Sequence, residues 1–397
     1  MADEGDGRLG TSGALSGVIV ADFSRVLAGP YCTMLLADMG ATVIKVEGPA
    51  GDDTRQWQPP DYDGESTYFL SVNRGKHAIR LDLKDADDLR TAYGIIGAAD
   101  VFIENYKPGG LAQFGLDAAS VERRWPRLIH ASITGFGPHG ATALPGYDLL
   151  AQAASGMMNL TGSPDGPPQR MGVALFDVVT GLHAALGILA ALRDREASGL
   201  GQRVDVNLMS SALSGLVNQT SGYVAGGVVP HRMGNDHPSL FPYGPFSTGD
   251  GILVICVGND AQFRILSAEL GAPEWADDPD FSTMRGRNAH RDRLRELIQD
   301  RLSHAGSDEW FTRLRDAGLP CSPILDVQGG VRFAEELGLS PVVEAGTGPS
   351  AVPTIKDPIE FSRSRTSYDK APPRLDEDRE AVLTWLAARD QASPDHR

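Results

Sequence analysis

Short apolar runs alternate with amphipathic stretches along the first half of the chain, and this alternation predicts an α/β fold. The pattern reads as a strand at 17–22, a helix at 24–39 and a second strand at 41–47. A β-α-β unit of this kind implies a parallel sheet with a right-handed crossover. Further strands are expected at 77–83, 100–104, 128–133 and 203–208, with helices at 85–96 and 118–124. We therefore predict a doubly wound sheet.

The most apolar stretch of the chain runs from Met171 to Leu192 and reads MGVALFDVVTGLHAALGILAAL. Its length of about 22 residues would suit a membrane span, but an aspartate, Asp177, would be costly within one. We predict a buried helix with Asp177 at or near its N-terminus. A carboxylate there can simply cap the helix. In an apolar wall it is also poorly hydrated and available as a nucleophile, and the pattern alone leaves both readings open.

The periodicity changes at Ala225, which indicates a second domain. Residues 225–246 show little periodicity, and they are followed by an expected strand at 252–257, helices at 262–270 and 287–303, and a strand-like segment at 319–325. Our predicted division assigns 1–16 to a disordered leader, 17–224 to the N-terminal part of a large domain, 225–330 to a smaller α+β domain with linkers, and 331–397 to a C-terminal return to the large domain.

Composition narrows the class of protein. The formal net charge of −16 argues against a nucleic-acid partner and against binding to an anionic membrane surface. The 3 cysteines are widely spaced, so neither a disulfide framework nor a zinc site is expected. The acidic, glycine-rich start has no apolar signal region, which favours a reduced, cytoplasmic protein.

Three loops carry candidate chemistry. The turn DFSRVLAGP after the first strand is not the GxGxxG fingerprint, so a nicotinamide or flavin enzyme is not expected. The loop 73–76 (NRGK) places two cations beside a glycine, and the loop 105–109 (NYKPG) follows a strand at the edge where open α/β sheets bind ligands. Cations, an asparagine and exposed N–H groups suit a phosphorylated ligand, although each loop taken alone could be a solvated turn.

These stretches together, in order and spacing, resemble the class III CoA-transferases, the CaiB/BaiF family, from about residue 17 to residue 386. The matching segments include ADFSRVLAGPYCTMLLADMGATVIKVE, NRGKHAIRLDLK, DVFIENYKPGGLAQFGL, ASITGFGP, GYDLLAQAASGMMNLTGSPDGPP, the stretch around Asp177, SGLGQRVDVNLM and RMGNDHPSLFPYGPF. The resemblance implies a Rossmann-like large domain built from the N- and C-terminal parts, a smaller second domain, and an interlocked homodimer.

The resemblance also implies a chemistry. CoA would move between an acyl-CoA donor and a small carboxylic acid acceptor through aspartyl anhydride and aspartyl-CoA thioester intermediates on Asp177. Coenzyme A and acyl-CoA would be substrates, with no permanently bound cofactor and no metal. The residues that match the CoA site are Val26, Leu27, Ala28, Arg74, Lys76, Asn105, Tyr106, Lys107 and Phe136. Those that match the substrate pocket are Trp57, Tyr147, Asn235 and His237.

Two departures from the family pattern bear on specificity. Leu27 replaces a glutamine of the formyl/oxalate members, and residues 234–239 replace their tetraglycine loop, which disfavours formate and oxalate as substrates. The main alternative is a 2-methylacyl-CoA racemase of the same family, which needs two acid/base groups. Such racemases carry a histidine where this chain has Tyr147, and a phenol is a poor base at neutral pH. A non-catalytic CoA-binding protein is disfavoured by the presence of Asp177.

Overall fold

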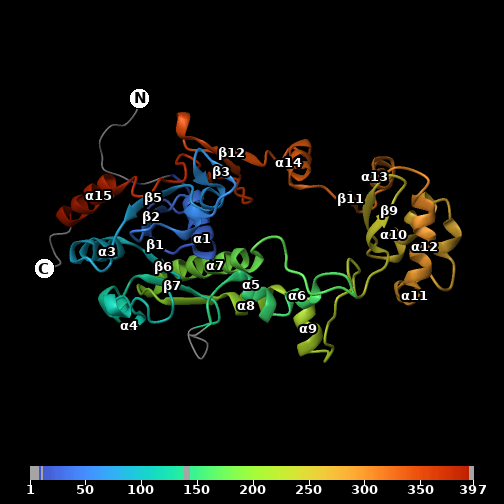
Figure 1. The fold of residues 1–397 in the computed structure, drawn as a ribbon, viewed down its shortest axis with the longest axis horizontal. Helices are drawn as coiled ribbons and strands as arrows, with labels where there is room; N and C mark the ends of the chain where they lie inside the picture. The colour runs from blue at the N-terminus through green and yellow to red at the C-terminus, as the bar shows by residue number, and fades with distance from the viewer. Residues whose placement is uncertain (1–8, 10–11, 138–143, 393–397) are drawn as a thin grey trace. The chain divides into compact units, whose positions relative to one another are not determined.

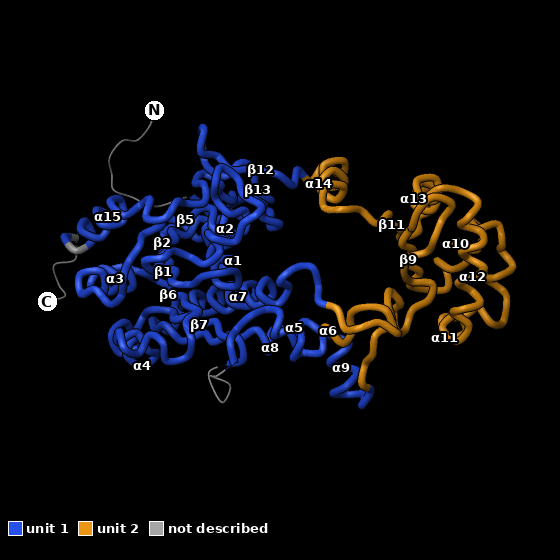
Figure 2. The backbone as a smooth tube through the Cα atoms, in the orientation of Figure 1, with its two compact units in different colours: residues 1–157, 170–228, 340–397 blue, residues 158–169, 229–339 orange. Residues whose placement is uncertain are grey.

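The computed structural model describes residue 9 and residues 12–137 and 144–392. The described residues divide into two compact units, unit 1 with residues 1–157, 170–228 and 340–397, and unit 2 with residues 158–169 and 229–339 (Figure 2). The predicted leader falls mainly outside the described residues. Its last part, from Ser12 to Ser16, is not disordered, because it forms a turn in which the Leu15 N–H donates to the Met39 carbonyl at 2.9 Å.

The centre of unit 1, within the described residues, is a parallel sheet of six strands in the order β5-β2-β1-β6-β7-β8 (Figure 1). These strands are β1 (Ile19–Phe23), β2 (Thr42–Glu47), β5 (Lys76–Arg80), β6 (Val101–Glu104), β7 (Ile129–Thr134) and β8 (Arg203–Asn207). Counted along the chain this is the order 3-2-1-4-5-6 of doubly wound nucleotide-binding folds. The order reverses between β1 and β6, and ligands of such folds bind outside the carboxyl ends of the strands at that point.

Helices cover both faces of this sheet, because its strands carry apolar side chains on both sides. On one face Val20, Val101 and Ile129 pack with Leu36 and Ile188. The helices of unit 1 are α1 (Ala28–Asp38), α2 (Thr67–Leu70), α3 (Ala86–Ala98), α4 (Ala118–Arg124), α5 (Asp148–Ala154), α7 (Leu175–Ser198), α8 (Leu208–Gly215), α9 (Asn218–Val224) and α15 (Arg379–Ala392). Figure 1 shows α1 and α7 on this face.

The opposite face is covered by α3, α4 and α15. Its core joins Ile19, Ala21 and Phe102 of the sheet to Ile95 of α3 and Trp385 of α15. The C-terminal part of the chain therefore returns to unit 1 as α15 and one short hairpin, and a second short hairpin lies in the N-terminal part of the unit. The hairpin strands are β3 (Asp61–Tyr62) with β4 (Glu65–Ser66), and β12 (Val342–Ala345) with β13 (Val352–Ile355).

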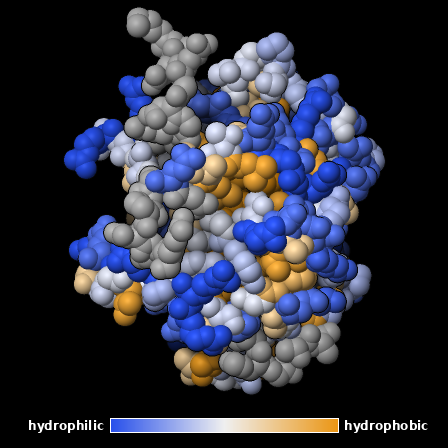
Figure 3. All heavy atoms as spheres, turned by 90° about the vertical axis from the view of Figure 1, so that its left-hand side faces the viewer, coloured by the Kyte–Doolittle hydropathy of each residue, from blue (hydrophilic) through white to orange (hydrophobic). Residues whose placement is uncertain are grey.

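Helix α7 is the only described helix that is long and apolar enough to cross a membrane. It packs against α1, α5 and α8 and against β7 and β8. Its residues Phe176, Ala184 and Ile188 are buried in the core of unit 1, so the prediction of a buried helix holds for one face of α7, whereas Leu182 and Leu186 are 46% and 66% exposed. On the face of the molecule in Figure 3, hydrophobic residues form separate patches among hydrophilic ones.

Unit 2 has its own core. Within the described residues, three antiparallel strands in the order β11-β10-β9 pack against helices around Phe246, Leu253, Phe263 and Leu294. The elements are β9 (Tyr243–Ser247), β10 (Ile252–Cys256), β11 (Cys321–Pro323), α10 (Asp260–Glu269), α11 (Met284–Ala289), α12 (Arg291–Leu302), α13 (Ser307–Asp316) and α14 (Val327–Glu336). A further short helix is α6 (Met157–Leu160).

The structure corrects several predicted boundaries. The helix expected at 24–39 begins only at Ala28, because the four preceding residues form a turn in which Val26 has a φ of 71°. The helix expected at 287–303 is two helices, α11 and α12, that meet at His290. Unit 2 also extends to residue 339, beyond the predicted limit of 330, and it includes residues 158–169.

Candidate functional site

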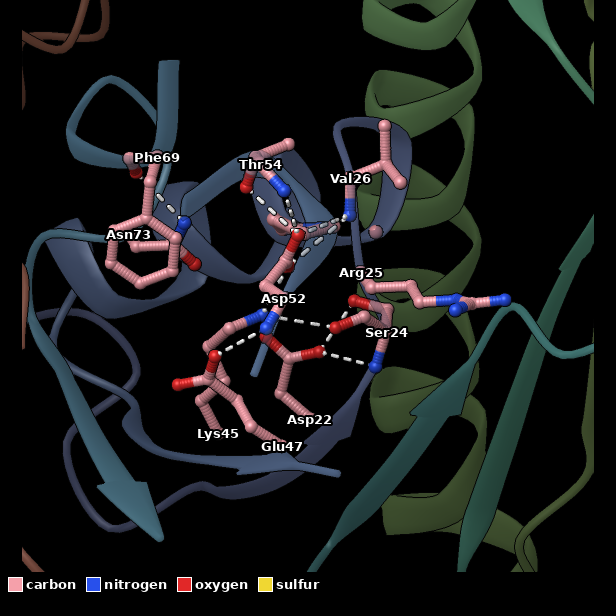
Figure 4. Close-up of polar contacts among 12 residues, drawn as sticks. Asp22, Ser24, Arg25, Val26, Lys45, Glu47, Asp52, Thr54, Phe69 and Asn73 are labelled. Carbon is pink, nitrogen blue, oxygen red and sulfur yellow. Dashed lines mark hydrogen bonds and ion pairs between the residues drawn. The ribbon is translucent and has the colours of Figure 1, made fainter. Parts of the chain in front are cut away.

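The turn from Ser24 to Leu27 lies at the carboxyl end of β1, where the strand order of the sheet reverses. Side chains from other segments satisfy its backbone polar groups. Asp22 accepts the N–H of Ser24 at 2.9 Å, and Asp52 accepts the N–H of Val26 (Figure 4). The Ser24 carbonyl accepts a hydrogen bond from Lys45 at 3.0 Å. The turn is therefore fixed by buried charges of the neighbouring strands and loops.

The loop after β6 holds the same turn from the opposite side. The Asn105 side chain accepts the N–H of Arg25 at 3.0 Å and donates to the Arg25 carbonyl at 2.7 Å. The next residue is fixed in turn, because Glu104 accepts the N–H of Tyr106 at 2.8 Å. The loops after β1 and β6, which are neighbouring strands, are thus joined by a pair of hydrogen bonds.

Asp177 lies in the first turn of α7, but it does not cap that helix. The cap comes from Asp148 of α5, whose Oδ1 accepts the N–H groups of Phe176 at 2.7 Å and of Asp177 at 3.2 Å. Gln152 donates to the other oxygen of Asp148 at 2.5 Å and to the Val173 carbonyl at 3.2 Å. Because Asp148 performs the capping, the Asp177 carboxylate is not required for it. Among the described residues that carboxylate has no hydrogen-bond partner.

Burial raises the pKa of Asp177 to about 7, and the negative charge of Asp148 adds to the effect. The carboxylate is therefore poorly hydrated and destabilised at neutral pH, which makes it a better nucleophile than a solvated one. The nearby phenol of Tyr68 has its pKa raised to about 12, first by burial and then by the charges of Asp177 and Asp148. Tyr68 consequently stays protonated beside these carboxylates.

A close helix contact places Asp177 beside the turn that follows β1. Gly181 of α7 lies against α1, and a Cβ built on it would be 2.6 Å from the Ala28 carbonyl oxygen. Asp177 is one helical turn before Gly181, on the same side of α7. The first N–H groups of α1 have no intrahelical acceptor, and no side chain caps this end of the helix. These donors belong to the same end of α1 as Ala28, which contacts α7 one turn after Asp177.

Asp177, the turn after β1 and the loop after β6 all line one cavity of about 600 Å³ in unit 1. Its lining consists of Arg25, Val26, Ala28, Asp53, Gln56, Trp57, Asn105, Tyr106, Lys107, Pro108, Ile133, Thr134, Gly135, Leu144, Pro145, Gly146, Tyr147, Asp177 and Leu208. Trp57 is 42% exposed and packs edge-on against Tyr68, with ring centroids 5.0 Å apart. Tyr147 is 60% exposed and directly precedes Asp148. The cavity thus combines the partly buried carboxylate of Asp177, which caps no helix, with aromatic side chains such as Trp57 and Tyr147 and with the cations Arg25 and Lys107.

Two of the predicted cations lie elsewhere. Arg74 forms a buried ion pair with Asp38 at 2.6 Å, and its side chain is 3% exposed. Lys76 is fully buried and pairs with Asp22 at 3.1 Å. Neither side chain lines the cavity that contains Asp177, and Arg74 borders a separate cavity of about 500 Å³ in unit 1. The NRGK loop serves the packing of unit 1, because its cations neutralise Asp38 at the C-terminus of α1 and Asp22 of β1.

The other predicted residues are also outside the cavity lining. The Leu27 side chain packs against a small cluster that contains Met34, Leu35 and Val72. Phe136 follows β7 but is not among the lining residues. Asn235 and His237 belong to unit 2, where the His237 ring accepts the N–H groups of Ser239 and Leu240. Within the described part of the chain, no group of three or more metal-ligating side chains was found.

Three functional residues, Asp148, Asp52 and Tyr68, were not predicted from the sequence. An aspartate at the start of a helix, as Asp148 is, normally reads as the cap of its own helix. That it caps α7 instead depends on a contact between segments 28 residues apart. Asp52 lies in a proline- and glycine-rich stretch, and Tyr68 lies in the four-residue helix α2 that follows it.

Comparison with known proteins identifies the family. Residues 15–379 match the sequence profile of CoA-transferase family III. A succinate–glutarate CoA-transferase of Agrobacterium fabrum is 40% identical over 384 residues, covering 94% of this chain and 95% of that protein. A succinyl-CoA:mesaconate CoA-transferase of Haloarcula hispanica is 37% identical, with 94% and 96% covered. The crystal structure of a CaiB/BaiF family protein from Brucella suis matches with a TM-score of 0.85 at 39% identity, covering 95% of this chain and 100% of that one. The chain belongs to CoA-transferase family III, and it is a CoA-transferase, as the sequence predicted.

Proposed function

We propose that this CoA-transferase moves CoA from an acyl-CoA donor to a carboxylic acid acceptor, with Asp177 as the covalent nucleophile. The observation that carries the proposal is the state of Asp177. Its carboxylate lines a cavity, lacks a hydrogen-bond partner among the described residues, and has its pKa raised to about 7 by burial and by Asp148. A carboxylate that only capped a helix would be bonded to N–H groups, and here Asp148 holds that position.

The reaction follows from this nucleophile. A carboxylate oxygen of Asp177 attacks the thioester carbonyl carbon of the donor, and the carbon–sulfur bond breaks to give a mixed anhydride and CoA thiolate. The thiolate attacks the aspartyl carbonyl, which releases the donor's carboxylate and leaves an aspartyl-CoA thioester. The acceptor carboxylate then attacks that thioester, the carbon–sulfur bond breaks, and a second anhydride and CoA thiolate are formed. Attack of the thiolate on the acceptor's acyl carbon yields the new acyl-CoA and restores Asp177.

Each of these steps passes through a tetrahedral oxyanion, which needs hydrogen-bond donors fixed beforehand. The free N–H groups at the start of α1, at Leu27 and Ala28, are the proposed donors. Their support is the contact of Gly181 with Ala28, which places this backbone beside the face of α7 that bears Asp177. A helix N-terminus also stabilises negative charge through its dipole.

The CoA chain is proposed to bind along the loop after β6, at Asn105, Tyr106 and Lys107. This loop lies at the switch point of the sheet and lines the same cavity as Asp177. Trp57 and Tyr147 would enclose the acyl group. We leave Arg74 and Lys76 out of the proposed ligand set because both are held in buried ion pairs. No permanently bound cofactor or metal is part of the proposal.

The proposed acceptors and donors are short dicarboxylic acids and their CoA thioesters, such as succinyl-CoA. Two observations support this choice. The relatives named above act on succinate, glutarate and mesaconate, and the cations Arg25 and Lys107 line the cavity, where they could pair with a second carboxylate. The Arg25 side chain is 52% exposed and contacts Asp53 at 3.4 Å, so it can exchange this partner for a ligand.

We also propose a cytoplasmic homodimer, interlocked as the family resemblance implies. The support within unit 1 is the number of large apolar side chains on α7 to α9 that remain in solvent. Leu186 is 66% exposed, Val217 is 67% exposed and Val224 is 81% exposed. A second copy that covered them would remove this area from water.

The proposal is tested by mass spectrometry of the protein after incubation with a panel of acyl-CoAs, followed by trapping with hydroxylamine or borohydride. We expect a label on the peptide that contains Asp177, and no label in the Asp177→Ala variant. The donor that gives the label identifies the substrate. Absence of any label, together with exchange of the α-proton of a 2-methylacyl-CoA in deuterated water, would refute the transferase mechanism and favour the racemase.

A further inference from the structure

Val26 adopts a backbone conformation that its side chain disfavours. Its φ is 71°, in the left-handed region, where Cβ of an L-residue crowds a carbonyl oxygen and a β-branched side chain is a clear outlier. Val26 nevertheless lines the cavity that contains Asp177. Such conformations persist only where surrounding contacts fix them, and they gather at functional sites. The contacts that fix Val26 therefore also fix one wall of this cavity.

Asp52 makes those contacts. Both of its carboxylate oxygens lie 3.2 Å from the Val26 nitrogen and accept its N–H (Figure 4). Oδ1 also accepts the N–H of Thr54 at 3.0 Å and its hydroxyl at 2.8 Å. Oδ2 is paired with the Lys45 ammonium at 3.0 Å. These hydrogen bonds and the ion pair hold the Asp52 carboxylate in one orientation, in which both oxygens accept the N–H of Val26.

Lys45 completes the arrangement from the other end of the same peptide segment. Its ammonium donates to the Ser24 carbonyl at 3.0 Å, so the Lys45–Asp52 pair holds the backbone on both sides of Arg25. Both side chains are 0% exposed. Burial opposes the charge on Asp52, but the nearby Lys45 holds the pKa of that carboxyl below its usual value. A buried pair of this kind contributes little net stability over apolar residues, which leaves a positional role to explain it.

We propose that Asp52, with Lys45 as its counter-ion, is a positioning residue of the transfer reaction. It holds Val26 in the left-handed conformation and thereby sets the backbone of residues 26–28 against Asp177. Neither Asp52 nor Lys45 lines the cavity, so Asp52 acts through the backbone that it holds, at Val26 and at the start of the short helix Asp53–Gln56. This inference rests on the proposed function, because the backbone it positions includes the proposed oxyanion donors.

A double-mutant cycle tests the proposal, because glycine adopts a φ of 71° without strain. If Asp52 serves to hold a strained valine, its removal should matter much less when residue 26 carries no Cβ. We expect Asp52→Ala to lower kcat at least about 10-fold in the wild-type background and less than about 3-fold in the Val26→Gly background. KM for the acyl-CoA should change little in either comparison, since Asp52 does not touch the ligand.

The matched control is Asp38→Ala, which removes an equally buried aspartate from an ion pair at the other end of α1. It should lower the melting temperature, as Asp52→Ala does, but its effect on kcat should be the same in both backgrounds. The proposal is overturned if Asp52→Ala leaves kcat unchanged, or if its effect is equally large with and without Val26→Gly.

Hydrogen exchange separates a failure of this inference from a failure of the proposed function. Mass spectrometry of the peptide around Val26 should show amide exchange at least about 10-fold faster in Asp52→Ala than in the wild type, whatever reaction the protein catalyses. If the wild type forms no acyl-enzyme, the proposed function fails, and unchanged exchange at Val26 would separately overturn the role of Asp52.

Discussion

Asp148 accepts the backbone N–H of Asp177 at 3.2 Å, so one carboxylate caps the helix that carries the other. This relationship gives the two acids different roles. Asp148 accepts hydrogen bonds from the free N–H groups at the start of α7, so Asp177 is not needed as the cap of that helix. The charge of Asp148 also acts against ionisation of Asp177, second in size to burial itself. Because Asp148 already accepts the first N–H groups of α7, the carboxylate of Asp177 does not bind them and stays available for reaction.

The first prediction concerns pH. Because the reactive form of Asp177 is the anion and its pKa is raised to about 7, kcat/KM should fall as pH decreases through about 7. Asp148→Asn removes one negative neighbour and keeps a capping side chain, so the acidic limb should move to lower pH. The measurement is the pH profile of kcat/KM for the acyl-CoA substrate in the wild type and in Asp148→Asn. An unmoved limb in Asp148→Asn would show that Asp148 does not influence the titrating group.

The second prediction concerns the stability of the free protein. The pKa of Asp177 is higher in the folded protein than its ordinary value of 3.8, so its ionisation destabilises the fold as pH rises between about 4 and about 7. Asp177→Asn should therefore stabilise the protein by about 1 to 2 kcal/mol at pH 8, after allowance for partial exposure. The gain should disappear at pH 4.

Urea denaturation of both proteins at the two pH values measures this difference. The same substitution should remove the acyl-enzyme signal and lower kcat by at least about 1,000-fold, as expected for loss of a covalent nucleophile. Equal stability of the two proteins at pH 8 would mean that Asp177 is not desolvated as the structure indicates.

The third prediction concerns the contact between α1 and α7. In Gly181→Ala the new Cβ would lie 2.6 Å from the Ala28 carbonyl oxygen, and backbone cannot give way as a flexible side chain can. We expect a loss of about 1 to 3 kcal/mol in the free energy of unfolding and a fall in kcat. Gly222→Ala is the control, because a Cβ on that helical glycine meets nothing within 4 Å. Thermal unfolding and steady-state kinetics of both variants provide the comparison.

The fourth prediction concerns Arg74, which the sequence suggested as a phosphate ligand. Arg74→Gln leaves Asp38 buried without its partner at 2.6 Å. Removing one member of a buried pair typically costs about 3 to 5 kcal/mol, so the melting temperature should fall clearly. KM for acyl-CoA, measured well below the melting temperature, should stay within about twofold of the wild type. A large rise in KM with unchanged stability would instead restore the phosphate-binding role.

The parallel sheet was predictable because buried parallel strands are rich in apolar residues, and the short segments at β1 (IVADF) and β6 (VFIE) are mostly apolar. The helix interruptions were not. The sequence of residues 210–224 is compatible with a single helix, but Val217 takes a φ of 41° and separates α8 from α9. The periodicity of apolar residues indicates which side chains are buried. It does not indicate that one residue within a segment, such as Val217, has a left-handed backbone conformation.

The same distinction applies to the site. Asp177 stood out because it is the one acid within a long apolar stretch, and the loop of Asn105 stood out because it follows a strand. Arg74 and Lys76 carried the same signal of exposed cations, yet their partners, Asp38 and Asp22, lie 36 and 54 residues away in the chain. Pairing between distant segments decides whether a cation binds a ligand or neutralises the core, and no local pattern records it.

The turn after β1 has a consequence for how the enzyme gains activity during folding. Its backbone is held by Asp22 and Lys45 from two strands, by Asp52 from the loop after β2, and by Asn105, 80 residues from Arg25. No single hairpin or helix can form this turn, so it can reach its final shape only after the central strands have assembled. During refolding, helical circular dichroism should therefore recover before catalytic activity does, and recovered activity will report the completed sheet.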